Sequence, residues 1–247
     1  MTLYERYIAG ETKTVYDDIE EFGESAFLPN NYADIEKVLD ETFERVAFNL
    51  SIIYRELLVI NYVFKTEFEC NSDKPLKKPL INSEKLLAKL DKSLKPFGFV
   101  PESLKIFYKV VGSCNFAWDY ETDEDILWKY ADPIQINSLD DLVNEVTNED
   151  FISESKEYYE GDGFVALELA ADFFTKDNVS GGLPYSIKLT NKPSIDAPFL
   201  YEEHDTTFVN YLRICFDNCG FSRMNNPDNI NDYQKFFDKV RPQLKKI

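Results

Sequence analysis

The sequence has a single histidine among its 247 residues. His204 lies between Glu203 and Asp205, and a flanking carboxylate could orient an imidazole as a general base. No serine or cysteine forms a nucleophile motif around it, and an acidic loop next to a helix start explains the triplet equally well. Motifs for a nucleophile elbow, a phosphate loop and a dinucleotide site are also absent. We therefore expect no enzymatic activity, no catalytic residues and no cofactor.

Cysteine, glycine and proline are also sparse. The four cysteines at 70, 114, 215 and 219 are scattered, unlike a disulfide framework. Cys215 and Cys219 lie one helical turn apart but lack the further Cys or His that a zinc site requires, so we expect them to be buried. Nine glycines and eleven prolines are too few for low-complexity linkers.

Long hydrophobic runs are missing too. No uncharged apolar stretch approaches the roughly 18 residues of a membrane helix. Residues 1–6 do not show a basic segment followed by an apolar run. We therefore expect no membrane association, no signal peptide and a cytoplasmic protein.

Acidic residues are abundant, and most of the excess lies in one segment. Residues 111–165 contain fifteen Asp and Glu against two Lys, a net charge of −13 out of −18 for the whole chain. Such a charge repels nucleic acid and membranes and attracts basic proteins. Four acids in this segment alternate as in a calcium loop, but the sixth and twelfth positions of an EF-hand would hold Glu124 and Tyr130. We therefore expect a solvated surface or a protein-binding surface rather than a metal site.

Aromatic residues interleave with these acids. Trp and Tyr are typical anchors of protein interfaces, and aromatic rings flanked by acids can receive Arg and Lys. The alternative is that Trp118 and Trp128 belong to the core. The predicted protein-binding residues are Trp118, Asp119, Tyr120, Glu121, Asp123, Glu124, Asp125, Glu157, Tyr158, Tyr159 and Glu160.

Hydrophobic periodicity predicts a helical N-terminal third. Apolar residues recur at three- and four-residue steps over residues 32–64, and the prolines of residues 73–79 interrupt this pattern. A second helix is expected from Ser83 until Pro96. Further helices are expected over residues 101–111, 138–146, 206–218 and 231–240, with strands over residues 116–118, 134–136, 164–169 and 185–189. This mixture without regular alternation indicates an α+β domain.

Several segments resemble the SUKH superfamily, which includes fungal cell-wall synthesis regulators and bacterial toxin-immunity proteins. The matching segments are VPESLKIFYKVVG at 100–112, NFAW at 115–118, Asp132-Pro133, KDNVSGGLPY at 176–185, Asp196, FVNYLR at 208–213 and Gly220-Phe221. Val100 replaces the usual leucine, and Cys219 and Ser222 stand where glycine and proline are frequent. The resemblance covers roughly half of the chain.

The resemblance implies a curved, mostly antiparallel sheet packed by helices, with non-covalent binding and no catalytic residues to carry over. We therefore expect a SUKH-like domain at residues 97–247 and a helical extension packed on it at residues 1–96. Family-motif residues with structural roles are expected at Pro101, Tyr108, Gly112, Asp132, Pro133, Ser180, Gly181, Gly182, Pro184, Tyr185 and Gly220. The glycine turn could be an anion-binding nest beside Lys176, but we favour a structural turn because no helix N-terminus follows it.

Composition alone predicts an acidic protein that binds proteins, and the resemblance adds toxin immunity. The expected partner is a basic toxin domain, for which a nuclease is suited because its surface must attract phosphates. The alternative is a regulatory or scaffolding module with an endogenous partner. In that case the residues 35, 39, 46, 53 and 57 could form a self-association face, so both monomer and dimer stay open.

Overall fold

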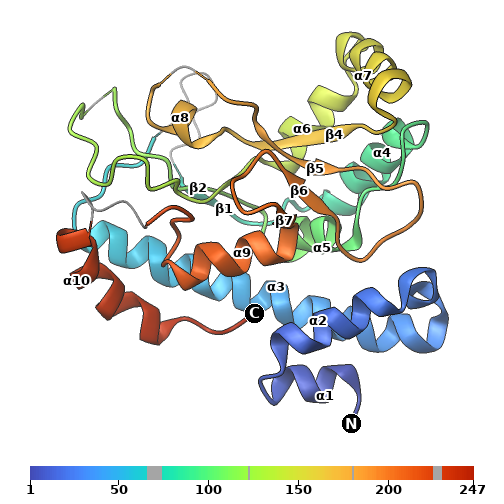
Figure 1. Cartoon of the computed structure of the whole chain (residues 1–247), viewed down its shortest axis with the longest axis horizontal. Coiled ribbons are helices and arrows are strands. Elements are labelled where there is room, and N and C mark those ends of the chain that lie inside the picture. Colours follow the sequence, from blue (N-terminus) through green and yellow to red (C-terminus); the bar gives the residue numbers. More distant parts are fainter. Residues whose placement is uncertain (66–73, 122, 180, 225–229) are drawn as a thin grey trace.

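The computed structural model describes residues 1–65, 74–121, 123–179, 181–224 and 230–247, with the side chains of residues 230–232 left out. Helices and short strands are mixed along the chain (Figure 1). The helices are α1 Leu3–Ile8, α2 Thr12–Glu21, α3 Pro29–Val59, α4 Ser83–Leu94, α5 Glu102–Val110, α6 Leu139–Val146, α7 Glu149–Asp162, α8 Phe173–Lys176, α9 Phe208–Asp217 and α10 Ile230–Val240. The strands are β1 Leu76–Lys77, β2 Ser113–Asn115, β3 Gln135–Ile136, β4 Ala166–Ala170, β5 Tyr185–Lys188, β6 Pro198–Leu200 and β7 Thr206–Thr207.

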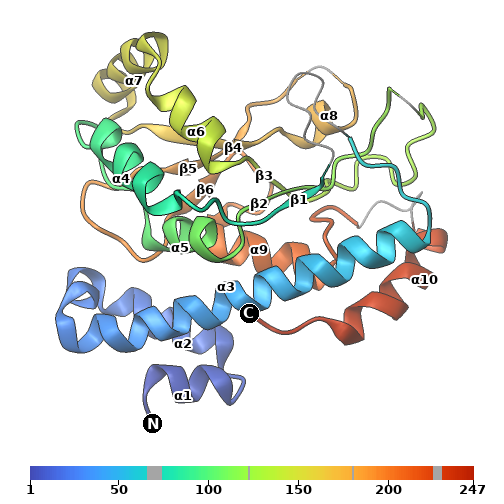
Figure 2. The ribbon, with the colours of Figure 1, turned by 180° about the vertical axis from the view of Figure 1, so that it is seen from behind.

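Helix α3 runs along the whole molecule and organises its core (Figure 2). Pro29 occupies its first turn, where the missing N–H is tolerated, and no glycine or proline follows within the helix. The helix ends at Val59, earlier than predicted, and Asn61 has a φ of +58°. The face that could have supported self-association is fully buried inside the chain, at Ile35, Leu39, Val46, Ile53 and Leu57. This face packs the core, so it does not offer a dimer interface.

The strands form two small antiparallel sheets, ordered β1-β2-β3 and β4-β5-β6-β7. A backbone hydrogen bond of 2.7 Å from Asn137 N to Leu169 O links β3 to β4, so the two sheets adjoin. The expected strands at 134–136, 164–169 and 185–189 correspond to β3, β4 and β5. The strand expected at 116–118 is wrong, because β2 ends at Asn115 and the next residues form a loop.

The N-terminal third is built into the rest of the fold. Strand β1 pairs with β2, with Leu76 opposite Cys114. Helix α4 packs against α6, and α3 packs against α5 and α10, while α1 and α2 cover the outer side of α3. The buried apolar side chains of all these elements form one continuous core. No break in packing marks the boundary expected at residues 96/97.

The motif around α5 has a clear structural role. Pro101 precedes the helix with extended backbone, and Gly112 ends it with a φ of +99°. A Cβ atom on Gly112 would lie 2.2 Å from the Lys77 carbonyl oxygen, so glycine allows β1 to approach. The Tyr108 hydroxyl donates a hydrogen bond to the Asn137 carbonyl at 3.2 Å. Gly220, with a φ of +100°, packs against Ile53 of α3.

The glycine turn before β5 is also structural. Ser180 lies outside the described residues. Gly181 and Gly182 do not adopt positive φ angles, which a nest would use. Gly182 instead lies against the side chain of Asp172, the residue that caps α8. Pro184 then leads into β5, where its carbonyl accepts a hydrogen bond from the Ser186 hydroxyl.

Candidate protein-binding surface

The acidic segment at residues 111–165 does not form one surface. Its first part is the loop between β2 and β3, and its second part is α6 with α7. The loop and α7 lie at opposite ends of the long axis of the molecule, as both views of the ribbon show (Figures 1 and 2). A single flat interface would therefore not contact both aromatic-acidic groups predicted from the sequence.

Trp118 and Trp128 belong to the core and are not available as interface anchors. Their relative exposures are 6% and 4%. The Trp118 indole N–H donates to the Asp123 carbonyl at 2.8 Å, and its ring meets Tyr62 edge to face at 4.8 Å. Trp128 packs edge to face on Phe221 at 5.0 Å. This burial favours the alternative that Trp118 belongs to the core, because aromatic packing under the loop encloses its ring.

The other loop residues divide between structural and exposed positions. Asp119 is buried, and its carboxylate accepts a hydrogen bond from the Glu121 N–H at 3.2 Å. The Tyr120 hydroxyl bonds to Lys65, whose ammonium lies 4.2 Å from the ring centroid. The exposed carboxylates of the loop are those of Glu121, Asp123, Glu124 and Asp125. The loop thus offers carboxylates, while its aromatic rings are already packed.

Helix α7 brings exposed acids and exposed aromatics together. Asn148 caps its N-terminus through the Asp150 N–H at 3.1 Å, and Gly163 ends it with a φ of +78°. Of its fourteen residues only Ser155 is buried. Tyr158 and Tyr159 are 61% and 40% exposed. The exposed acids are Glu149, Asp150, Glu154, Glu157, Glu160 and Asp162.

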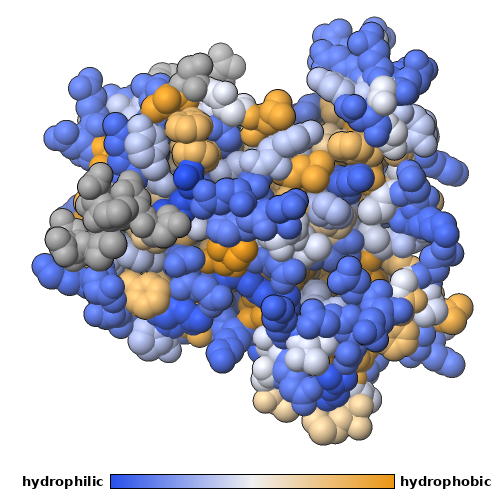
Figure 3. Space-filling model, in the orientation of Figure 1, coloured by the Kyte–Doolittle hydropathy of each residue, from blue (hydrophilic) through white to orange (hydrophobic). Residues whose placement is uncertain are grey.

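The charge on α7 is unfavourable for the helix itself. Six acids against Lys156 give this helix a net charge of −5. Glu154, Glu157 and Glu160 are spaced three residues apart, so like charges are neighbours on the helix surface. The last turn contains acids and no base, against the preference of the helix dipole for positive charge at that end. Local helix stability therefore explains Glu149 and Asp150 in the first turn but not the four later acids. Figure 3 shows the helix projecting from the molecule with a hydrophilic surface.

Three residues of the matching segments, Asp132, Lys176 and Tyr185, meet Ser222 in a buried polar network. The Lys176 ammonium lies 2.5 Å from the Asp132 carboxylate, and both side chains are at most 2% exposed. The Tyr185 hydroxyl donates to the other Asp132 oxygen at 3.0 Å, and the Ser222 hydroxyl donates to the same atom. The pKa of Tyr185 is raised, first by burial and then by the negative charge of Asp132. The network joins the loop before β3 to α8 and β5, and Pro133 forms a bridge with Phe221. Its enclosure gives it a structural role.

His204 lies in a turn that the Glu202 carboxylate stabilises. Its Nδ1 atom lies 2.8 Å from the Glu202 carboxylate, which also accepts hydrogen bonds from the backbone N–H groups of His204 and Thr206. The Glu202 side chain is almost fully buried, so it holds the turn before β7 together. Within the described part of the chain, no group of three or more His, Cys, Asp or Glu side chains is placed to hold a metal ion.

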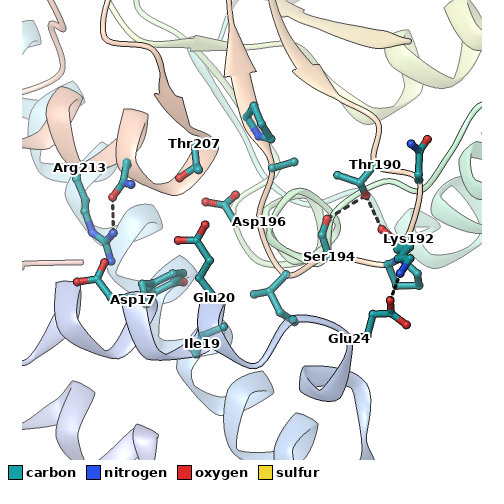
Figure 4. Close-up of a pocket in the computed structure, with 18 residues that line it drawn as sticks. Asp17, Ile19, Glu20, Glu24, Thr190, Lys192, Ser194, Asp196, Thr207 and Arg213 are labelled. Carbon is teal, nitrogen blue, oxygen red and sulfur yellow. Dashed lines mark hydrogen bonds and ion pairs between the residues drawn. The ribbon is translucent and has the colours of Figure 1, made fainter. Parts of the chain in front are cut away.

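A pocket of about 500 Å³ lies between α2 and the segment that joins β5 to β6. Its floor and walls come from three stretches of chain, residues 16–24, 190–198 and 207–213. Tyr16, Ile19 and Ile195 supply apolar surface, while carboxylates enter from α2 and from the β5–β6 segment (Figure 4). The sequence patterns did not indicate this pocket, because its residues are distant along the chain.

No family model, curated protein or solved structure matches this chain. The SUKH resemblance therefore stays a prediction from the motifs. In the described ranges, every helix is too short or too polar to cross a membrane.

Proposed function

We propose that this chain is a non-enzymatic protein-binding module that receives a basic protein on α7. The observation that carries the proposal is the arrangement of charge and aromatic rings on this helix. Glu154, Glu157, Glu160 and Asp162 are placed against the preferences of the helix, and two tyrosines stand exposed among them. Binding a cationic surface would neutralise this self-repulsion, and the tyrosine rings would supply contact area.

The most specific form of the proposal is an immunity protein that neutralises a basic toxin domain, such as a nuclease. The sequence motifs support the immunity role, and the charge supports the class of partner. Outside residues 111–165 the chain is nearly neutral, with thirty acids and twenty-five bases. The excess is divided between the β2–β3 loop and α6 with α7, at opposite ends of the long axis, so attraction to α7 rests on the net charge of −5 of that helix. Long-range steering raises association rates and weakens as salt is added.

The test is co-expression with toxin domains encoded beside the gene, scored by growth rescue and by complex formation. The decisive variant carries Glu154→Gln, Glu157→Gln and Glu160→Gln. We expect its association rate to fall by about tenfold at low salt, because steering by charge is lost. Tyr158→Ala should instead raise the dissociation rate, since anchors act mainly after encounter.

A matched control removes the same number of charges elsewhere. Glu36, Glu44 and Glu84 are exposed on α3 and α4, and replacing all three by Gln gives the same net charge as the α7 variant. The proposal predicts that this control keeps rescue and association rate. Equal losses in both variants would show a nonspecific charge effect. A further variant tests whether the β2–β3 loop, and not α7, is the binding surface. It neutralises the four exposed loop carboxylates together, those of Glu121, Asp123, Glu124 and Asp125.

A regulatory or scaffolding role would use the same helix with an endogenous partner. Two results together would favour that role. The chain would neutralise none of the toxin domains, and it would capture a basic partner encoded elsewhere in a manner that depends on α7. Unchanged binding in the α7 variant would contradict both forms of the proposal.

A further inference from the structure

The pocket between α2 and the β5–β6 segment is lined by more carboxylates than cations. Its lining includes the carboxylates of Asp17, Glu20, Glu24 and Asp196 and the cations of Lys192 and Arg213. Lys192 forms an ion pair with Glu24 at the rim. Two lining cations thus face four carboxylates, and one cation is already paired.

Arg213 is held by oxygen atoms that do not belong to the four lining carboxylates. Its guanidinium donates to the Ile247 main-chain oxygen at 2.9 Å, to the Thr12 carbonyl at 3.2 Å and to Asn210 Oδ1 at 2.6 Å. It also lies 4.5 Å from the centroid of the Tyr16 ring. These contacts hold Arg213 in the wall. Among the described residues, no ion pair involves Asp17, Glu20 or Asp196.

Two of these carboxylates reach the same space from opposite walls. Figure 4 shows the Glu20 side chain extending from α2 towards Asp196. Asp196 is positioned by the Ser103 hydroxyl at 2.8 Å and by the Val209 N–H at 3.1 Å. Burial raises its pKa, although hydrogen bonds from Thr207 and Ser103 act in the opposite direction. A cation beside Asp196 would favour its charged form.

The remaining surface of the pocket is apolar and suits an organic cation. Ile19, Ile195 and Ala197 are buried residues that line it, and the ring of Tyr16 adds an aromatic face. The volume of about 500 Å³ is within the usual range for small-molecule sites and far exceeds that of a metal ion. Methylene groups would contact this wall while a charged head lies between the carboxylates.

We propose that this pocket binds a guanidinium group on an aliphatic stem, as in an arginine side chain. A guanidinium is planar, presents five N–H donors and is more weakly hydrated than an ammonium. It can therefore bridge carboxylates that approach from two walls, and such charge-assisted hydrogen bonds are strong. The inference goes beyond the proposed function, because a small ligand can fill the pocket whether or not a protein binds α7.

The test uses two nearly isosteric probes, N-acetyl-arginine amide and N-acetyl-citrulline amide, titrated into the full chain by calorimetry and followed by amide NMR. The citrulline probe keeps the stem and the planar head but has no charge. We expect saturable binding of the arginine probe, with shifts at residues of α2 and the β5–β6 segment. The citrulline probe should bind about tenfold more weakly or not at all, as expected when a charged hydrogen bond is lost.

The variant Glu20→Gln should weaken the arginine probe by about tenfold. Its control is Glu21→Gln, which removes an exposed charge from the next position of α2, outside the pocket lining. Both carboxylates are exposed, so the fold should tolerate both changes. Absence of saturable binding up to about 10 mM, equal binding of the two probes or an unchanged affinity in Glu20→Gln would overturn the proposal. Tighter binding of N-acetyl-lysine amide than of the arginine probe would overturn the assignment to a guanidinium. None of these outcomes depends on α7.

Discussion

Replacing Lys176 by Met should strongly destabilise the fold. Met has a similar length and volume, so the change removes the charge with little loss of packing. The Asp132 carboxylate would stay enclosed with only the hydroxyls of Tyr185 and Ser222 as donors. Breaking a buried ion pair by removing one partner costs about 3–5 kcal/mol. We therefore expect the free energy of unfolding to fall by about 4 kcal/mol.

The chain offers a matched control in a second lysine ion pair. Lys192 and Glu24 are in contact, but their side chains are 72% and 66% exposed. Water solvates both charges when the pair is broken, so an exposed pair contributes only about 0–1 kcal/mol. Lys192→Met should therefore lower the free energy of unfolding by less than about 1 kcal/mol. The two variants make the same chemical change and differ in burial.

Urea unfolding followed by tryptophan fluorescence measures both variants. Trp118 and Trp128 are buried, so their emission should report global unfolding. A double variant, Asp132→Asn with Lys176→Met, removes both charges and should recover part of the lost stability. Equal, small effects of Lys176→Met and Lys192→Met would refute the reasoning that the buried carboxylate requires its cation.

Two further predictions concern glycine and a carboxyl group. Gly112→Ala should destabilise the fold by about 3 kcal/mol, because a Cβ atom would lie 2.2 Å from the Lys77 carbonyl oxygen at a φ of +99°. A Cβ atom on Gly161 of α7 would have no atom within 4 Å, so Gly161→Ala should raise the free energy of unfolding by about 0.5 kcal/mol. Equal effects of the two glycine substitutions in urea unfolding would contradict this account. The pKa of Glu145 is raised from 4.5 to about 7, first by burial and then by the charge of Glu168. The native state therefore binds its proton at higher pH than the unfolded state, so stability should decrease as pH rises from 4.5 to 7. Glu145→Gln should reduce this slope, to which the raised pKa values of Asp177, Glu168 and Asp196 also contribute. It should gain about 1 kcal/mol at pH 8, a value reduced for the exposure of the side chain. A slope that the substitution leaves unchanged between pH 4.5 and 8 would contradict this account.

Elements with strong apolar periodicity could be predicted from the sequence. The expected helices at 83–96, 101–111, 138–146, 206–218 and 231–240 correspond to α4, α5, α6, α9 and α10. Each buries one stripe of side chains, so its pattern records the neighbour that it packs against. Strands β6 and β7 are only three and two residues long, too short for an alternation to be recognised.

The tryptophans show why the sequence could not separate buried rings from exposed ones. Trp118 and Trp128 stand among acids in the sequence, as interface anchors often do. In the fold, Glu121, Asp123, Glu124 and Asp125 are exposed and Asp119 is buried, while the rings of Trp118 and Trp128 pack with Tyr62 and Phe221 below the loop. The local sequence shows that acidic and aromatic residues alternate, but it does not show which side chains face the core and which face solvent. Long-range contacts with the segment after α3 and with the segment after α9 determine which side each residue faces.

The sequence predicted Glu157, Tyr158, Tyr159 and Glu160 as binding residues, but it predicted neither the helix α7 that carries them nor the pocket. Helix α7 buries only Ser155, so it has no apolar stripe for periodicity to detect, and its acids disfavour helix at its C-terminal end. The pocket consists of ordinary residues from three distant stretches, so no local pattern marks it. Sequence patterns record burial, because burial imposes a period on the chain. Exposed surfaces impose no such period on the sequence. Carboxylates without a nearby cation can therefore be recognised only in the folded structure.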